Sequence, residues 1–215
     1  MLHNYFITAI RNFWRQKTYS LINIAGLSVG LACSFLIFVW VDYELSWDQF
    51  LDDGHRIHRL MRNHHGEVTI NTRASVPGAL ASFLKNEYPE VSETVLVAPG
   101  RPAVITYDDK IFREPGSQVD ASFFQVFSFP LIQGNSEMAL ADPDHIAISQ
   151  RLAEKLFGND WKGALGKTVV MNQSHSLWSY RDRSFEVNAI FDNIPQNSSL
   201  RFEFLLPMST YAEDK

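Results

Sequence analysis

"GLSVGLACSFLIFVWVDYELSWD", residues 26–48, is an apolar run that turns acidic at its end. It belongs to a longer stretch, because no charged residue occurs between Thr18 and Val41. At about 1.5 Å per residue, a helix over these residues measures roughly 36 Å, which exceeds the roughly 30 Å hydrocarbon core of a bilayer. The sequence therefore predicts a transmembrane helix over residues 18–41.

Two kinds of cleaved signal compete with a retained anchor. A secretory signal has an apolar segment of about 7 to 15 residues followed by small residues, whereas this run ends in FVWV at residues 38–41. A lipoprotein signal is the stronger rival, because GLAC at residues 30–33 loosely resembles a lipobox. The position three before Cys33 is Gly rather than Leu, however, and eight apolar or small residues follow the cysteine. A retained anchor is the favoured interpretation.

The charges that flank the run predict its orientation. Arg11, Arg15 and Lys17 precede it, and the first acidic residue of the chain is Asp42. By the positive-inside rule, the N-terminus lies in the cytoplasm and the residues after the span lie on the other side. We therefore expect a protein of the bacterial inner membrane with residues 42–215 in the periplasm.

Small residues recur every fourth position within the span, at Gly26, Gly30 and Ser34. This spacing places them on one helix face, where a second membrane helix is able to approach closely. The alternative is that small residues are simply common in membrane spans. We predict that these residues form a helix-packing surface.

Residues 1–17 have an amphipathic pattern. Apolar residues at helical spacing form one side, and these are Leu2, Tyr5, Phe6, Ala9, Ile10, Phe13 and Trp14. Aromatic and basic residues beside a membrane span are typical of a helix that lies in the membrane surface. The predicted anchoring residues are Phe6, Ile10, Phe13, Trp14, Arg11, Arg15 and Lys17.

Composition excludes several classes of function for the remainder of the chain. Hydrophobic residues make up 46% and charged residues 20% of the 215 residues, as in globular proteins. Residues 42–215 hold 16 basic and 24 acidic side chains, which argues against binding of nucleic acid. The single cysteine, Cys33, excludes an internal disulfide and a cysteine-rich metal site.

The sequence GALGKTVV at residues 163–170 contains the Gly-Lys-Thr ending of a phosphate-binding P-loop. That motif requires a glycine five positions before Gly166, and residue 161 is Trp. A strand, rather than a helix, is predicted after Lys167, so that no helix N-terminus would face a phosphate. We expect a turn that leads into a strand.

Four histidines lie close together, at His55, His58, His64 and His65. No acidic residue or cysteine completes a metal-ligand set at a recognisable spacing. The favoured interpretation is a solvated hairpin, and no metal or cofactor site is predicted.

A hydrolase site is the hypothesis raised by Asp142, Asp144, His145 and Ser149. No serine of the chain is surrounded by a G-x-S-x-G elbow, and Asp-Pro-Asp is common in turns. Ser149 precedes a helical pattern and is better explained as its N-cap. No catalytic residue is predicted.

The remaining pattern alternates short strands and helices and predicts an α+β fold. The expected strands are residues 56–63, 68–72, 94–98, 103–107, 110–112, 167–171, 185–191 and 201–208. The expected helices are residues 78–88 after Pro77, a short aromatic helix within 119–127 that follows the end of a strand, and residues 149–158 closed by Gly158. Phenylalanines at positions 123, 124, 127 and 129 are expected to pack in the core.

The order of the segments is more specific than any single motif. After the basic amphipathic start come NFWRQKTYSLINIAGLSVGLACSFLIFVWVDYELSWDQF, PGALASFLKNEYPEV, VDASFFQVFSFPLIQG, ISQRLAEKLFG, GKTVV and NIPQNSSLRFEFLLP. Together these segments closely resemble the start of MacB/FtsX-like ABC transporter permeases, particularly the long ones of Bacteroidota. The resemblance covers nearly the whole chain.

The resemblance implies a first transmembrane helix followed by a MacB-like periplasmic core domain over residues 42–215. Members of this family carry further membrane helices, work with a cytoplasmic ABC ATPase, and usually form dimers. They convert ATP-driven motion into conformational change in the periplasm, a mode called mechanotransmission. The sequence ends at Lys215 without a second apolar span, so it looks like an N-terminal fragment, or a family member cut short, with the domain truncated at its C-terminal end.

The leading hypothesis is therefore a non-enzymatic permease segment whose partners are an ABC ATPase, other permease helices or a second permease copy, and the lipid membrane. The alternative is a single-span periplasmic sensor or ligand-binding module. An anchored hydrolase is a third possibility, and it lacks a catalytic constellation.

Overall fold

The structure is a computed structural model that describes Tyr5, Arg11 and residues 14–66, 69–100, 102–176 and 179–210. The chain divides into two compact units, Met1–Trp47 and Asp48–Lys215. Three of the predicted anchoring residues, Phe6, Ile10 and Phe13, lie outside the described residues.

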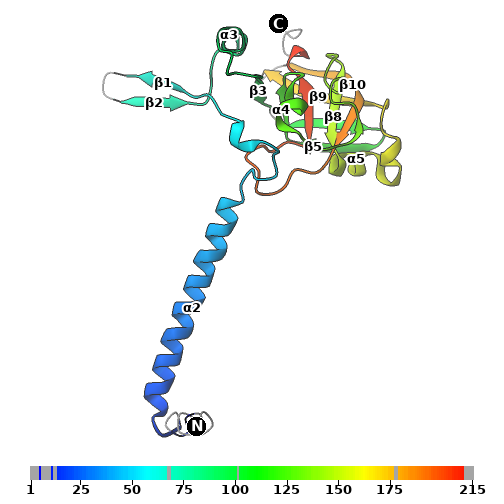
Figure 1. Cartoon of the computed structure of the whole chain (residues 1–215). Helices are drawn as coiled ribbons and strands as arrows, with labels where there is room; N and C mark the ends of the chain where they lie inside the picture. Colours follow the sequence, from blue (N-terminus) through cyan, green and yellow to red (C-terminus); the bar gives the residue numbers. More distant parts are fainter. Residues whose placement is uncertain are drawn as a thin grey trace. The chain divides into compact units, whose positions relative to one another are not determined.

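The first unit contains helix α2, Lys17–Leu45, which runs through the blue part of Figure 1. None of its 29 residues is buried, and its length and composition are sufficient to cross a membrane. Ser46 is the C-cap of the helix, and its hydroxyl donates a hydrogen bond to the carbonyl of Tyr43 at 2.6 Å. The helix predicted over residues 18–41 is therefore confirmed, and it extends to Leu45.

Within the described part of the second unit, nine strands form one mixed sheet (Figure 1). The strand order is β3-β6-β11-β8-β10-β9-β4-β5, and β7 also pairs with β10. Only the pairs β8–β10 and β6–β11 are parallel among these described strands. The strands are β3 Val97–Pro99, β4 Ala103–Tyr107, β5 Lys110–Glu114, β6 Gly116–Val119, β7 Leu131–Gly134, β8 His145–Ser149, β9 Thr168–Ser176, β10 Ser179–Phe191 and β11 Phe204–Pro207.

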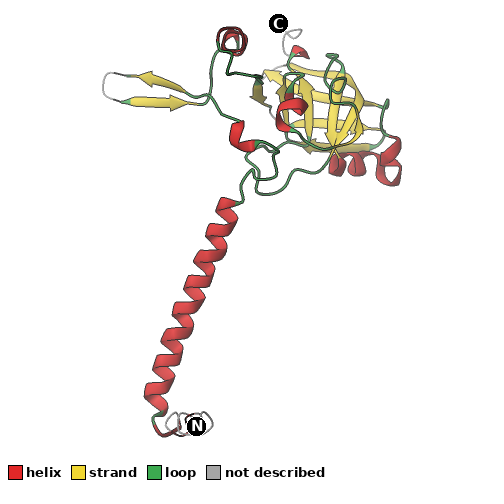
Figure 2. Cartoon of the chain, viewed as in Figure 1, coloured by secondary structure: helices red, strands yellow, loops and turns green. Residues whose placement is uncertain are grey.

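Two further strands, β1 Arg62–His65 and β2 Ile70–Arg73, form a separate antiparallel hairpin. Figure 2 distinguishes the strands in yellow from the helices in red. The described helices of this unit are α3 Ala79–Glu87, α4 Phe123–Phe127, α5 Gln150–Phe157 and the 3-10 turns η1 Gly54–Arg56 and η2 Gly158–Gly163. The α+β fold is thus confirmed.

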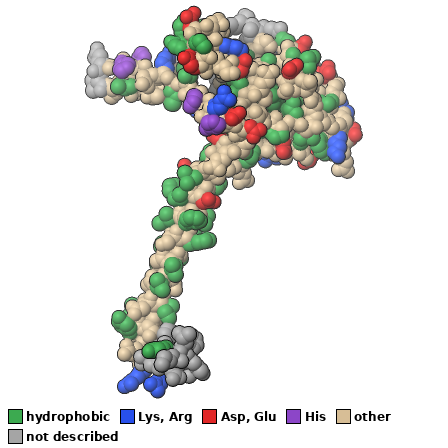
Figure 3. Space-filling model, viewed as in Figure 1, with side chains coloured by type: hydrophobic (Ala, Val, Ile, Leu, Met, Phe, Trp, Pro, Cys, Tyr) green, Lys and Arg blue, Asp and Glu red, His purple; other side chains and the backbone are tan. Residues whose placement is uncertain are grey.

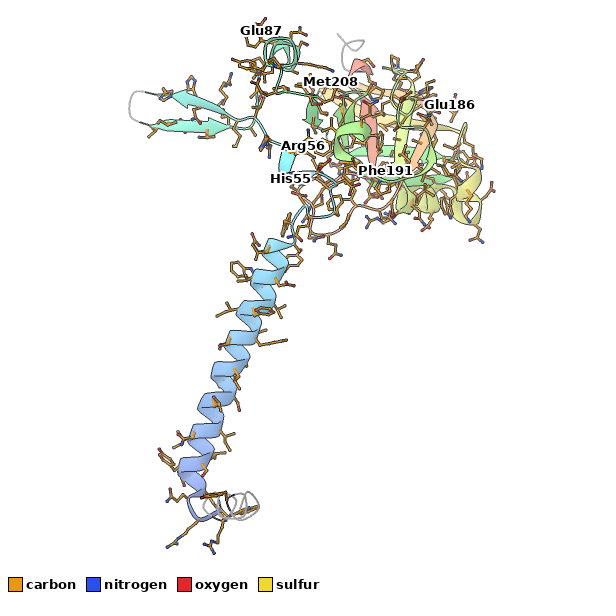
Figure 4. All side chains as sticks on the ribbon, viewed as in Figure 1. His55, Arg56, Glu87, Glu186, Phe191 and Met208 are labelled. Carbon is orange, nitrogen blue, oxygen red and sulfur yellow. The ribbon has the colours of Figure 1, made fainter. Side chains whose placement is uncertain are left out.

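The sheet has a hydrophobic cluster on each face, because successive side chains of a strand point to opposite sides. Ile146 and Ile148 of β8 pack with α5, whereas Ala147 between them packs with α4 and its aromatic neighbours. On β10, Phe191 belongs to the second cluster (Figure 4). Phe123 of α4 is fully buried, which confirms the expected core packing of this aromatic segment.

Two local predictions about helix ends are also confirmed. Ser149 caps α5, since its hydroxyl accepts a hydrogen bond from the backbone N–H of Leu152 at 3.0 Å. Gly158 ends α5 with a φ of +63°, a conformation that glycine adopts without strain. These short-range signals therefore position α5 at the end of strand β8.

The predicted hairpin exists, but its boundaries are wrong. The first strand spans Arg62–His65 rather than residues 56–63, so His64 and His65 belong to the strand and not to the turn. The physical reason is that Asp53, with a φ of +55°, starts the 3-10 turn η1 over residues 54–56. Strands β7 and β8 are absent from the sequence interpretation. Four of the five residues of β8 are buried, so this strand lacks the polar alternation that marks a half-exposed strand.

Candidate functional site

The predicted helix-packing surface of α2 is open along its glycines. A Cβ atom added at Gly26 or at Gly30 would meet nothing within 4 Å. The hydroxyl of Ser34 donates a hydrogen bond to the carbonyl of Gly30 at 2.9 Å, so this polar group is satisfied inside its own helix. The surface thus offers space for close approach, and Ser34 needs no partner from a neighbouring helix.

Basic and aromatic side chains gather at the start of α2. Arg11, Trp14, Arg15 and Lys17 are all exposed, and Figure 3 shows blue Lys and Arg side chains at this end of the helix. The ammonium group of Lys17 lies 5.6 Å from the ring centroid of Trp14, a cation–π distance. An exposed aromatic and cationic cluster is what a membrane interface accommodates.

Asp48 connects the segment that follows α2 with a loop distant in the sequence. Its backbone N–H donates to the carbonyl of Asn197 at 3.0 Å, and its carboxylate accepts from the N–H of Ser199 at 2.8 Å. Asp48 has a φ of +55°, a left-handed conformation held by these bonds. The sequence interpretation missed this role, although NIPQNSSL belongs to the segments that carry the family resemblance.

The serine and the histidine of the hydrolase hypothesis do not contact each other and have different hydrogen-bond partners. The hydroxyl of buried Ser149 is hydrogen-bonded to Glu203, which also pairs with Arg151 at 3.0 Å. His145 stands four residues earlier on the same strand, about 13 Å away at the rise of a β-strand. Its Nδ1 lies 3.0 Å from the amide nitrogen of Asn188. Ser149 is therefore a structural cap in this arrangement.

Lys167 of the P-loop-like sequence has a structural role. Its ammonium group donates to Asp160 at 2.9 Å and lies 5.1 Å from the ring centroid of Phe157. This hydrogen bond to the Asp160 carboxylate raises the pKa of Lys167 above its usual value. Gly166 has a φ of +75° and is followed by strand β9, which confirms the predicted turn into a strand.

The clustered histidines occupy three different local structures. His55 lies in η1, His58 follows it, and His64 and His65 are in β1 (His55 is labelled in Figure 4). Among the residues that the structure describes, no three His, Cys, Asp or Glu side chains are placed to bind one metal ion.

Comparison with known proteins identifies the family. The MacB-like periplasmic core domain matches residues 20–215. A solved domain assigned to a permease protein from Porphyromonas gingivalis is 26% identical with a TM-score of 0.57, over 74% of this chain and 67% of that chain. No curated protein matches the chain.

Two other solved structures are similar at lower levels. The periplasmic region of MacB from Actinobacillus actinomycetemcomitans is 16% identical with a TM-score of 0.46, over 63% of this chain and 56% of that chain. The extracellular domain of the noncanonic ABC-type transporter YknZ from Gram-positive bacteria is 18% identical with a TM-score of 0.46, over 63% of this chain and 64% of that chain. The chain thus spans between about half and two thirds of the length of each of these solved relatives. With the match over residues 20–215 and one apolar N-terminal helix, it belongs to the MacB/FtsX-like permease family and carries the MacB-like periplasmic core domain.

Proposed function

We propose that this chain is the N-terminal segment of a MacB/FtsX-type permease subunit. Residues 18–41 anchor it in the bacterial inner membrane, residues 1–17 lie at the cytoplasmic surface, and residues 42–215 lie in the periplasm. The observation that carries this proposal is the apolar helix α2, none of whose residues is buried and most of which lies inside the family match over residues 20–215.

In this proposal the segment has no catalytic role of its own. A cytoplasmic ABC ATPase hydrolyses ATP, and α2 passes the resulting motion to the periplasmic domain, with export or release as the outcome. The glycine face of α2 packs against other permease helices or against a second permease copy, because Gly26 and Gly30 leave room for a neighbouring backbone.

Purification of the native full-length protein from membranes in mild detergent tests the partnership. We expect mass spectrometry to identify a Walker-motif ATPase in a stoichiometric amount. Recovery of the anchored protein alone would contradict the proposal and favour a single-span module that binds a periplasmic ligand.

Replacement of both glycines by isoleucine, G26I together with G30I, tests the helix-packing surface. We expect severalfold less co-purified permease or ATPase partner, because the added side chains hold a neighbouring helix away. The isolated chain tolerates both changes, since a Cβ at either position meets no atom within 4 Å.

A matched control places the same bulk on the other side of the helix. Ser28 and Ala32 are also four residues apart, and at 100° per residue they lie roughly opposite the glycine face. The double variant S28I and A32I should retain the partner. Equal losses from both double variants would show that this face has no special role.

A further inference from the structure

The hairpin β1–β2 carries two arginines directly opposite each other. Its register pairs Arg62 with Arg73 and His64 with Asn71. Because directly opposed residues share a face, and alternate pairs share the same face, these four side chains project to one side. The Cβ atoms of such a pair are about 4.5–5.5 Å apart.

This arrangement has an electrostatic cost within the protein. Like charges placed directly opposite each other destabilise a strand pair. Within the described part of the chain, no hydrogen bond or ion pair involves the side chain of Arg62 or Arg73. All residues of both strands are exposed, and a two-stranded hairpin alone is at best marginally stable in water. An anionic surface would relieve the repulsion and order the hairpin.

The basic character is confined to this segment. Residues 54–73 contain four arginines, four of the seven histidines of the chain and a single acidic residue, Glu67. Residues 42–53 contain five acidic and no basic residues, and residues 74–215 contain 18 acidic and 12 basic residues. Purple histidine side chains mark this segment in Figure 3. The net charge of residues 54–73 is therefore positive, whereas the net charge of the other residues between 42 and 215 is negative.

Exposed apolar side chains lie among these basic residues. Leu60 and Met61 directly precede Arg62 in the chain and are 48% and 55% exposed, whereas Ile70, paired with His65, projects from the other face of the hairpin. Apolar side chains interleaved with arginines suit a lipid interface, where the former enter the headgroup region and the latter contact phosphates. Arginine also binds phosphate oxygens in a bidentate manner. An acidic protein surface would use the arginines but not the apolar side chains.

The chain keeps this segment close to the membrane span. Nine residues separate Leu45, the last residue of α2, from the first histidine of the segment, His55, and even a fully extended chain over those ten steps reaches only roughly 35 Å. We propose that the hairpin of β1 and β2 docks on anionic phospholipid headgroups through the face that carries Arg62 and Arg73. The proposal rests on the membrane anchoring proposed above.

Hydrogen exchange of the full chain in lipid nanodiscs tests this docking. One set of discs contains phosphatidylcholine alone, and the other contains about 30% phosphatidylglycerol. We expect amide exchange in β1 and β2 to be at least fivefold slower in the anionic discs, because one arginine near an anionic surface contributes a factor of about five. The difference should disappear in about 0.5 M NaCl, which screens the attraction.

The double variant R62Q and R73Q should bring the ratio of the two exchange rates close to one. The ratio, rather than either rate, is compared because removing the opposed charges also stabilises the free hairpin. A matched control, R113Q with K162Q, removes the same charge from exposed positions elsewhere in the periplasmic unit and should keep the wild-type ratio.

Several results would overturn the docking. These are a wild-type ratio of one, an equal loss in both double variants, or slowing that depends on protein density in the disc and not on lipid charge, which would indicate contact between copies. A chain that enters neither disc contradicts the anchor and the docking together. A chain that enters both discs with a ratio of one contradicts the docking alone.

Discussion

Phe123→Ala is expected to lower the free energy of unfolding of the periplasmic unit by about 3–5 kcal/mol, the usual cost of truncating a buried phenylalanine. Phe123 has no exposed surface. Its ring centroid lies 4.8 Å from that of Phe127, 5.6 Å from Phe124 and Phe129, and 5.7 Å from Phe202. The alanine variant leaves a cavity among these rings, because Phe124 and Phe127 are held in α4 and Phe202 belongs to a distant segment, so that they cannot all move inward.

Urea unfolding of the detergent-solubilised full chain, followed by near-UV circular dichroism, measures this effect. Phe83→Ala is the control, because Phe83 is 53% exposed and its loss should change the free energy by less than about 1 kcal/mol. If both variants unfold at the same urea concentration, the aromatic cluster is not the centre of this core.

Gly116→Val is expected to have a comparable effect, about 3 kcal/mol or more, through overpacking rather than a cavity. A Cβ at Gly116 would lie 2.1 Å from the Cζ atom of Phe204. The two residues are partners in the parallel pair β6–β11, and Phe204 is 2% exposed. The buried Phe204 ring has no space into which it can move, and β6 and β11 cannot separate without losing the hydrogen bonds between them.

Two comparisons identify the clash as the cause. Gly78→Ala should be nearly neutral, because its added Cβ would lie 3.7 Å from Leu96, an ordinary contact. Phe204→Leu should restore part of the stability lost in Gly116→Val, since the clashing ring atoms are then absent. Full stability of Gly116→Val alone would contradict the close packing of β6 against β11.

Short-range patterns predicted the elements whose signals lie within a few residues. The uncharged run between Thr18 and Val41 predicted α2. Ser149 and Gly158 predicted the ends of α5, because a capping hydroxyl and a left-handed glycine act on the adjacent turn. The aromatic spacing around Phe123 predicted a buried helix.

Features that depend on distant segments were not predictable in the same way. The strand order, with β11 between β6 and β8, depends on pairing between segments far apart in the sequence. The opposition of Arg62 and Arg73 depends on a register that the misplaced turn concealed. Among the predicted site residues, the space at Gly26 and Gly30 follows from their having no side chain, whereas the internal hydrogen bond of Ser34 required coordinates.

The bonds between Asp48 and the loop at Ser199 determine when this unit can finish folding. Asp48 is made soon after helix α2, but Ser199 follows 151 residues later. At about 5–20 residues per second, translation needs roughly 8–30 s to supply it. Strand β11, which separates β6 from β8, is also completed only then. From their own synthesis until β11 is complete, β6 and β8 therefore each keep an unpaired edge, and during that time the nascent domain is vulnerable to aggregation.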